Sequence, residues 1–147
     1  MMAFRRIRVG ELVTLLGSAS VIVSLALPWY GGSTLGTLDA WDTFGAGLVL
    51  LLAAACAGLA MVVSALAERS TALPVSLAVW SVAVGFAGVI AAIVRVLERP
   101  SHATSLCAGA WLALGGAIAI ALGAWLTLRD EHVSAYDPVS PPPRPRP

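Results

Sequence analysis

The chain has 147 residues, of which 59% are apolar and 12% are charged, and its net charge is +1. Ordinary soluble domains contain about 45–50% apolar and about 25% charged residues. The composition therefore excludes an ordinary soluble domain and predicts a protein that uses the lipid bilayer as part of its solvent. The small net charge also argues against a nucleic-acid partner.

Four apolar segments follow one another along the chain, at residues 9–27, 40–67, 73–94 and 103–128. Each is close to the roughly 20 residues that a helix needs to cross the hydrocarbon core of a membrane. The connections between them are short, so consecutive helices should be antiparallel neighbours. We predict an all-α fold, a membrane-embedded antiparallel four-helix bundle that forms one transmembrane domain over residues 1–129.

The first apolar segment carries a polar face. Glu11, Thr14 and Ser18 are spaced at i, i+3 and i+7, which places them on one side of a helix. Acidic groups inside membranes often act in proton or substrate transfer, so these three residues are a candidate intramembrane polar site. The alternative, which we favour, is a salt bridge between Glu11 and Arg8 at the membrane surface. We also expect this segment to be an uncleaved span and not a secretory signal, because no A-x-A cleavage site precedes Pro28.

The loop after the first segment reads LPWYGGSTLGTLDAWDTF, residues 27–44. Pro28 disfavours helical geometry at the residue before it, which predicts the end of the first helix. Aromatic side chains are enriched at headgroup level, and carboxylates at the start of a helix stabilise its N terminus. We therefore expect Asp39 and Asp42 to cap the second helix. The alternative is an outward-facing ligand or cation site made of five residues: Trp29, Tyr30, Asp39, Trp41 and Asp42.

Small residues recur at four-residue spacing within the apolar segments, which permits close helix packing in lipid. The predicted packing stripes are Cys56, Ala60 and Ser64; Ala83, Ala87 and Ala91; Gly88 and Ala92; and Gly115, Ala119 and Gly123. Trp80 is expected between helices, and Trp111 and Trp125 nearer the two membrane surfaces. These stripes favour a tight bundle or an oligomer and do not distinguish between them.

Arginine placement predicts the orientation, because cytoplasmic segments are enriched in basic residues. With the N terminus inside, seven arginines are cytoplasmic and two, Arg95 and Arg99, are outside. We therefore expect a multi-pass protein of the bacterial inner (plasma) membrane with both termini in the cytoplasm. The segment 130–147 is proline-rich and too polar to bury a core, so we predict a disordered cytoplasmic tail.

Catalytic and cofactor motifs are missing from the sequence. It contains no G-x-S-x-G, H-E-x-x-H, C-x-x-C or Walker-type motif. Its two histidines, His102 and His132, lie outside the apolar segments, where they could not ligate a haem within the membrane. Cys56 and Cys107 fall at different predicted depths, and we interpret both as free packing residues. We expect no enzyme activity, no cofactor and no metal.

Several short motifs carry a resemblance to a known family. The first span ends in LPWYGG, the second opens with LDAWDTF, the chain begins with the basic FRRIR, and the fourth span contains GAW and leaves through Arg-Asp-Glu into the tail. In these features the chain resembles small four-span integral membrane proteins of actinobacteria and related high-GC bacteria. The likeness covers nearly the whole chain and implies a fold but no activity. Claudin-like proteins also have four spans, but their loop signature includes two cysteines, and residues 28–39 contain none.

Together these features predict a non-catalytic integral membrane protein, a scaffold or accessory subunit that packs against membrane partners or against itself. Its partners would be the lipid bilayer and other membrane proteins or further copies of the chain. Two alternatives remain from other classes: a small transporter or channel component, based on the polar face of the first span, and an outer-face ligand sensor, based on the aromatic and acidic loop.

Overall fold

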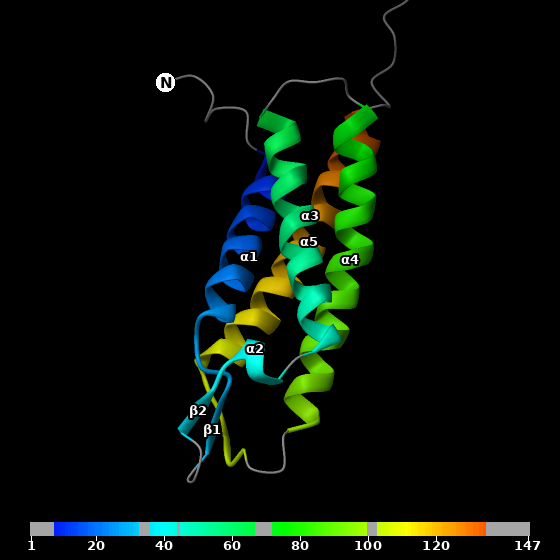
Figure 1. Ribbon diagram of the computed structural model, residues 1–147. Coiled ribbons are helices and arrows are strands. Elements are labelled where there is room, and N and C mark those ends of the chain that lie inside the picture. Colours follow the sequence, from blue (N-terminus) through cyan, green and yellow to red (C-terminus); the bar gives the residue numbers. More distant parts are fainter. Residues whose placement is uncertain (1–7, 33–35, 44, 67–71, 100–102, 135–147) are drawn as a thin grey trace, which may run out of the picture.

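The computed structural model describes residues 8–32, 36–43, 45–66, 72–99 and 103–134. This part of the chain is mostly helical, as predicted, and Figure 1 shows the long helices lying side by side with a small β-sheet at one end. The helices are α1 (Val9–Leu25), the short α2 (Ala40–Thr43), α3 (Ala46–Leu66), α4 (Ala72–Leu97) and α5 (Ala108–Ser134). The tail beyond residue 134 lies outside the described residues.

Three of the helices are long and apolar enough to cross a membrane, over Gly47–Leu66, Ser76–Leu97 and Ala108–Asp130. Helix α1 is also apolar but has only 17 residues. It begins after Arg8, whose backbone N–H donates to the Glu11 carboxylate at 3.1 Å, and this bond is one half of a capping box. It ends at Leu25, three residues before Pro28, close to the predicted position.

The second predicted helix is wrong in detail, because it is broken near its start. Gly45 has φ +47°, a left-handed conformation that glycine adopts without the steric cost of a Cβ. The chain therefore forms α2 and then α3 instead of one helix over residues 40–67. The last helix also differs: it starts at Ala108 and not at residue 103, and it continues to Ser134, past the predicted end.

The β-sheet is absent from the all-α prediction. It contains β1 (Tyr30–Gly32), β2 (Gly36–Leu38) and β3 (Ser105–Leu106), in the order β2-β1-β3. Both pairs are antiparallel, with Tyr30 opposite Leu38 on one side and opposite Leu106 on the other. The sheet thus joins the segment after α1 to the segment before α5.

Backbone hydrogen bonds continue this joining beyond the strands. The Cys107 N–H donates to the Trp29 carbonyl, and the Gly109 N–H donates to the Pro28 carbonyl at the start of α5. Glycine is required where the two segments touch. A methyl group at Gly31 would lie 2.7 Å from the Ser105 hydroxyl oxygen, and one at Gly109 would lie 2.8 Å from the Pro28 carbonyl oxygen.

The closest helix contact is between α1 and α5, and it is made by two reciprocal glycine pairs. A methyl group at Gly116 would lie 2.8 Å from the Gly17 carbonyl oxygen, and one at Gly17 would lie 2.7 Å from the Gly116 carbonyl oxygen. Gly10 and Gly123 meet in the same way, because a methyl group added to either would lie 2.6 Å from the carbonyl oxygen of the other. The two pairs are separated by seven residues along each helix, and the helices run antiparallel. The two backbones therefore touch directly over two helical turns.

The predicted small-residue stripes are partly wrong about which way they face. Gly88 and Ala92 are buried on α4, as a packing stripe requires. Three other residues, Cys56, Ala60 and Ala83, are exposed at the helix surface. On α5 the predicted Gly123 faces inward against α1, but the second inward glycine is Gly116 and not Gly115, where an added methyl group would meet nothing within 4 Å.

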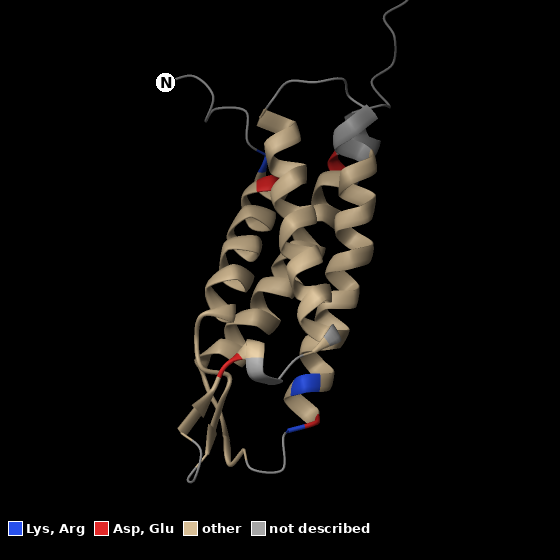
Figure 2. Cartoon of the chain, viewed as in Figure 1, with Lys and Arg blue, Asp and Glu red and all other residues tan. Residues whose placement is uncertain are grey.

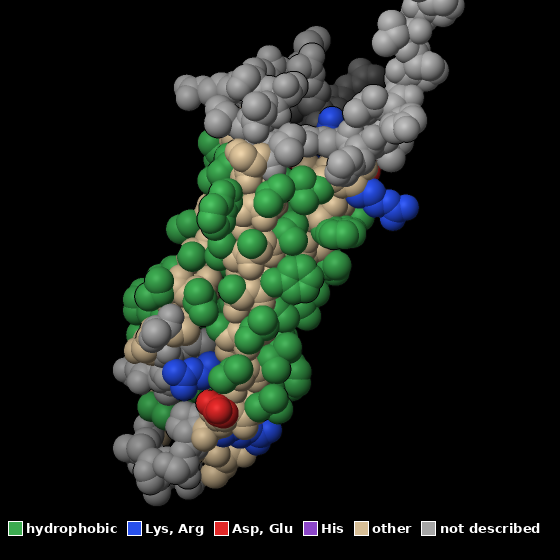
Figure 3. All heavy atoms as spheres, turned by 90° about the vertical axis from the view of Figure 1, so that its right-hand side faces the viewer, with side chains coloured by type: hydrophobic (Ala, Val, Ile, Leu, Met, Phe, Trp, Pro, Cys, Tyr) green, Lys and Arg blue, Asp and Glu red, His purple; other side chains and the backbone are tan. Residues whose placement is uncertain are grey.

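The outer surface of the helices is apolar along most of its length. Figure 3 shows mainly hydrophobic side chains on the face that carries α4, with charged side chains toward its two ends. Figure 2 shows the same separation over the described chain, because the middle of each helix carries no Lys, Arg, Asp or Glu. Trp80 is 66% exposed on this surface, so the expectation that it packs between helices is wrong.

The adjacent glycines of α5 allow a direct test of the α1–α5 contact. We expect Gly116→Ala to lower the free energy of unfolding by about 1–3 kcal/mol, because its methyl group would overlap the α1 backbone. Gly115→Ala, the same change one residue away, should be neutral or stabilising by up to about 1 kcal/mol, because alanine favours helix and the position is open. Thermal unfolding of both variants in detergent provides the measurement. Equal stability of the two would contradict the contact.

Candidate functional site

Trp29 is a core residue of the helix–sheet junction. Its side chain is fully buried, and its indole N–H donates to the Ser24 carbonyl at 2.8 Å. Its backbone N–H donates to the Leu38 carbonyl. It lies against the start of α5, where a methyl group at Gly109 would be 2.8 Å from its ring. Trp29 therefore links α1, β2 and α5, and its ring is buried inside the protein.

Tyr30 is also fully buried, and it connects the sheet to α4. Its hydroxyl donates to the Arg95 backbone carbonyl at 2.7 Å. Burial raises the pKa of the Tyr30 phenol above its ordinary value, and the positive charges of Arg95 and Arg99 oppose that rise. The phenol is therefore neutral at ordinary pH and serves as a hydrogen-bond donor that holds the last turn of α4.

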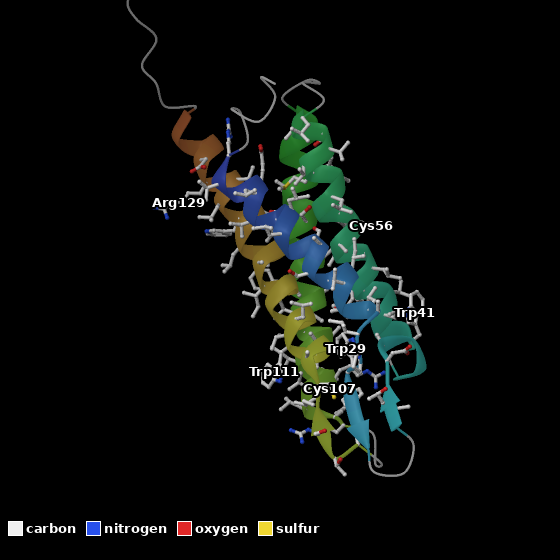
Figure 4. All side chains as sticks on the ribbon, turned by 90° about the vertical axis from the view of Figure 1, so that its left-hand side faces the viewer. Trp29, Trp41, Cys56, Cys107, Trp111 and Arg129 are labelled. Atoms are coloured by element: carbon white, nitrogen blue, oxygen red, sulfur yellow. The ribbon has the colours of Figure 1, made fainter. Side chains whose placement is uncertain are left out.

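Asp39 caps a helix as predicted, but the helix is the four-residue α2. Its carboxylate accepts the Trp41 backbone N–H at 2.9 Å, which is the usual geometry of a side-chain N-cap. Trp41 is 60% exposed, and Figure 4 places it on the outside of the molecule near the sheet. The side chain of Asp42 lies outside the described residues.

The side chains of four of the five residues in the candidate outer-loop site are described, and these four do not line a common accessible space. Trp29 and Tyr30 are buried, the Asp39 carboxylate accepts the Trp41 backbone N–H, and Trp41 points outward. The rings of Trp29 and Tyr30, which a ligand would need, are buried and bond other parts of the protein. The loop residues build the sheet end of the molecule and offer one exposed tryptophan at its surface.

The polar face of α1 is divided into two unrelated parts. Glu11 is half-buried near the start of the helix and bonds the Arg8 backbone. Thr14 and Ser18 are fully buried, and their hydroxyls donate to the Gly10 and Thr14 carbonyls, each at 2.9 Å. A side chain at Gly58 of α3 would collide with Ser18 and Thr14. These hydroxyls are therefore covered by neighbouring helices and satisfied within their own helix.

Metal-ligating residues do not gather in the described part of the chain. No three His, Cys, Asp or Glu side chains there are placed to hold an ion. Cys56 and Cys107 are both free thiols, as expected, but Cys56 is exposed and does not pack inside. Figure 4 shows them at different levels along the helices.

An open groove of about 430 Å³ lies between α3 and α4 near the sheet end, and the sequence did not predict it. Two rows of α4 side chains line it, each at four-residue spacing: Ala87, Ala91 and Arg95; and Ile90, Val94 and Glu98. Gly47 and Leu50 of α3 form the opposite side. The available signal was the alanine stripe continuing into Arg95, which we interpreted only as a packing surface.

Comparison with protein-family models, with curated proteins and with solved structures finds no match for this chain. The resemblance to four-span actinobacterial proteins therefore stays a prediction. Function has to be argued from the geometry of the helices, the sheet and the groove.

The Tyr30 bond to α4 predicts a pH-dependent stability. Tyr30→Phe should lower the free energy of unfolding by about 0.5–1.5 kcal/mol at neutral pH, because the Arg95 carbonyl loses its donor. In the native protein the raised phenol pKa means that this contribution is complete below pH 10 and is lost as the pH rises through the folded-state pKa.

Thermal stability in detergent, measured from about pH 8 to about pH 11.5, provides the test of this linkage. The native protein should lose stability at the alkaline end more steeply than Tyr30→Phe. The other tyrosine supplies the control, and Tyr136→Phe should follow the native curve. Parallel curves for the native protein and Tyr30→Phe would contradict the role given to the phenol.

Proposed function

We propose that this chain is a non-catalytic integral membrane protein that acts as a scaffold or accessory subunit. In this proposal α1, α3, α4 and α5 form a membrane-embedded antiparallel four-helix bundle, and the β-sheet stands at one membrane surface. The observation that carries the proposal is the contrast between a closely packed interior and an apolar outer surface. The interior offers few polar groups that could bind or transfer a solute, whereas the surface is suited to lipid and to apolar partners.

Membrane embedding is supported by the distribution of charge and of tryptophan. Three helices have the length and hydropathy of spans, and large side chains such as Leu16, Phe86 and Ile90 are exposed along the helices. The exposed tryptophans Trp111 and Trp125 lie about 21 Å apart along α5. Tryptophan is enriched at both surfaces of a membrane.

The arginine distribution supports an orientation with both termini in the cytoplasm and the β-sheet outside. In this orientation Arg95 and Arg99 flank the outer end of α4, and the end of α5 with the segment after it is cytoplasmic. The protein would then present its sheet to the outside and its proline-rich tail to the inside of the plasma membrane of a bacterial cell.

The packing between α1 and its neighbours disfavours the two alternative functions. A transporter or channel needs polar groups along a path, but Thr14 and Ser18 bond their own helix and are buried. An outer-face sensor needs accessible aromatic groups, but Trp29 and Tyr30 are buried in the junction. The transporter alternative becomes an outcome of the functional test.

The functional test combines co-purification with solute flux. The tagged chain should co-purify in mild detergent with a stoichiometric membrane protein or with further copies of itself, detected by mass spectrometry after crosslinking in intact membranes. The purified protein in sealed vesicles should leave ion and small-solute permeability at the level of empty vesicles. Flux above that level, lost in Glu11→Gln or Thr14→Val, would replace the scaffold with a transporter.

The orientation can be tested with single cysteines in a variant that lacks Cys56 and Cys107. Thr37 is exposed in β2, so Thr37→Cys should react with a membrane-impermeant thiol reagent added outside intact cells. Ser140→Cys in the tail should react only after the membrane is opened. Labelling of Ser140→Cys in sealed cells would reverse the orientation.

A further inference from the structure

The groove between α3 and α4 combines an apolar lining with one positive and one negative side chain at the same end. We propose that it binds one membrane phospholipid with a primary ammonium headgroup, of the phosphatidylethanolamine class. An acyl chain would lie along Ala87 and Ala91, the phosphate would meet Arg95, and the ammonium group would meet Glu98. This inference rests on the membrane location proposed above.

The dimensions of the groove suit an acyl chain. Its α4 side runs from Ala87 to Glu98, which is about 16 Å at the helical rise of about 1.5 Å per residue. One leaflet of a bilayer contributes about half of the roughly 30 Å hydrocarbon core. The groove volume of about 430 Å³ falls within the roughly 300–1,000 Å³ of small-molecule sites. The groove therefore extends about as far as one lipid chain reaches.

The side chains that form the groove explain why this space is open. Three of the lining residues are small, Ala87 and Ala91 on α4 and Gly47 on α3, so they leave room between the helices. Leu50, Ile90 and Val94 complete the apolar lining. Aliphatic side chains of this kind offer dispersion contacts to a hydrocarbon chain and no hydrogen bond to a polar ligand.

The charged end of the groove selects the headgroup. Arg95 and Glu98 are one helical turn apart, at i and i+3, and both line the groove. A guanidinium forms charge-assisted hydrogen bonds to phosphate, and a carboxylate forms them to a primary ammonium group. An anionic glycerol headgroup offers no cation to Glu98, and a choline headgroup has no N–H to donate. The pair therefore matches a zwitterionic lipid with an –NH₃⁺ group.

The position of Arg95 is fixed from behind by the sheet. Its backbone carbonyl accepts the Tyr30 hydroxyl at 2.7 Å, so the last turn of α4 is held while the side chain reaches the groove. A substitution of the Arg95 side chain leaves this backbone bond in place. Arg95→Gln thus tests the charge without removing the contact between α4 and the sheet.

Native mass spectrometry of the full chain in mild detergent provides the test, with ethanolamine, glycerol and choline phospholipids of identical acyl chains added in turn. The native protein should retain one ethanolamine lipid in preference to the others. Arg95→Gln should weaken its binding about tenfold, as expected for the loss of one charged hydrogen bond. Glu98→Gln should remove the preference for ethanolamine over glycerol lipid. Ala91→Leu should weaken the binding of all three lipids, because the larger side chain would fill the groove.

Two matched controls lie on the same helix or just beyond it. Arg99→Gln removes a neighbouring positive charge outside the groove, and Ala83→Leu makes the same addition as Ala91→Leu on the exposed surface. Both should bind ethanolamine lipid within about twofold of the native protein, a difference below about 0.4 kcal/mol. Thermal unfolding of each variant separates loss of the site from loss of the fold.

Three results would overturn the lipid site: equal binding of the three lipids by the native protein, equal weakening in controls and groove variants, or a dimer in place of the lipid adduct. In each case a chain that still partitions into membranes and co-purifies with its partner leaves the proposed function standing. A chain that remains in solution without detergent would instead refute the membrane location, and with it both proposals.

Discussion

The backbone contact between α1 and α5 determines how the rest of the chain can be arranged. In the membrane location proposed above, apolar surface alone would not drive the helices together, so their association would depend on close packing and hydrogen bonds. The pairs Gly10–Gly123 and Gly17–Gly116 provide that packing by letting two backbones meet. Their antiparallel register also brings the end of α1 beside the start of α5. The segments 28–31 and 104–109 then lie close enough to form β1–β3 pairing and the hydrogen bonds that continue it.

The same close packing limits which polar side chains the interior can hold. The buried hydroxyls beside the α1–α5 contact bond within their own helices. Thr14, Ser18 and Thr127 all donate to the carbonyl four residues earlier. Ser81 of α4 is buried without a hydrogen-bond partner for its hydroxyl, the one such side-chain group in the described part of the chain. The interior is thus built for packing, and its polar atoms are largely consumed by local bonds.

The sequence predicted the helices because their signal is local, and it missed the features that depend on distant partners. Apolar length is readable from residues 73–94 alone, and α4 covers that range. The strands of the sheet have only two or three residues and form where α1 and α5 adjoin. They are too short to show the alternating apolar pattern by which a strand can be predicted. Adjacent glycines gave no indication that Gly116 and not Gly115 faces α1. From its residue type and its place at a helix end, Trp29 would be expected at a membrane surface. Its burial depends on the bond to the Ser24 carbonyl and on the start of α5, which covers its ring.

Small residues have opposite consequences on the two sides of this molecule. Between α1 and α5 the glycines face each other, so removing side chains lets the backbones close and leaves no space. Between α3 and α4, Gly47, Ala87 and Ala91 border an opening. The two cases differ in what the small residues meet. Between α1 and α5 each glycine meets the backbone of a facing glycine, whereas the lining of the opening also includes Leu50, Ile90 and Val94 and two charged residues at one end. A stripe of small residues therefore predicts close contact only where the facing backbone can approach it.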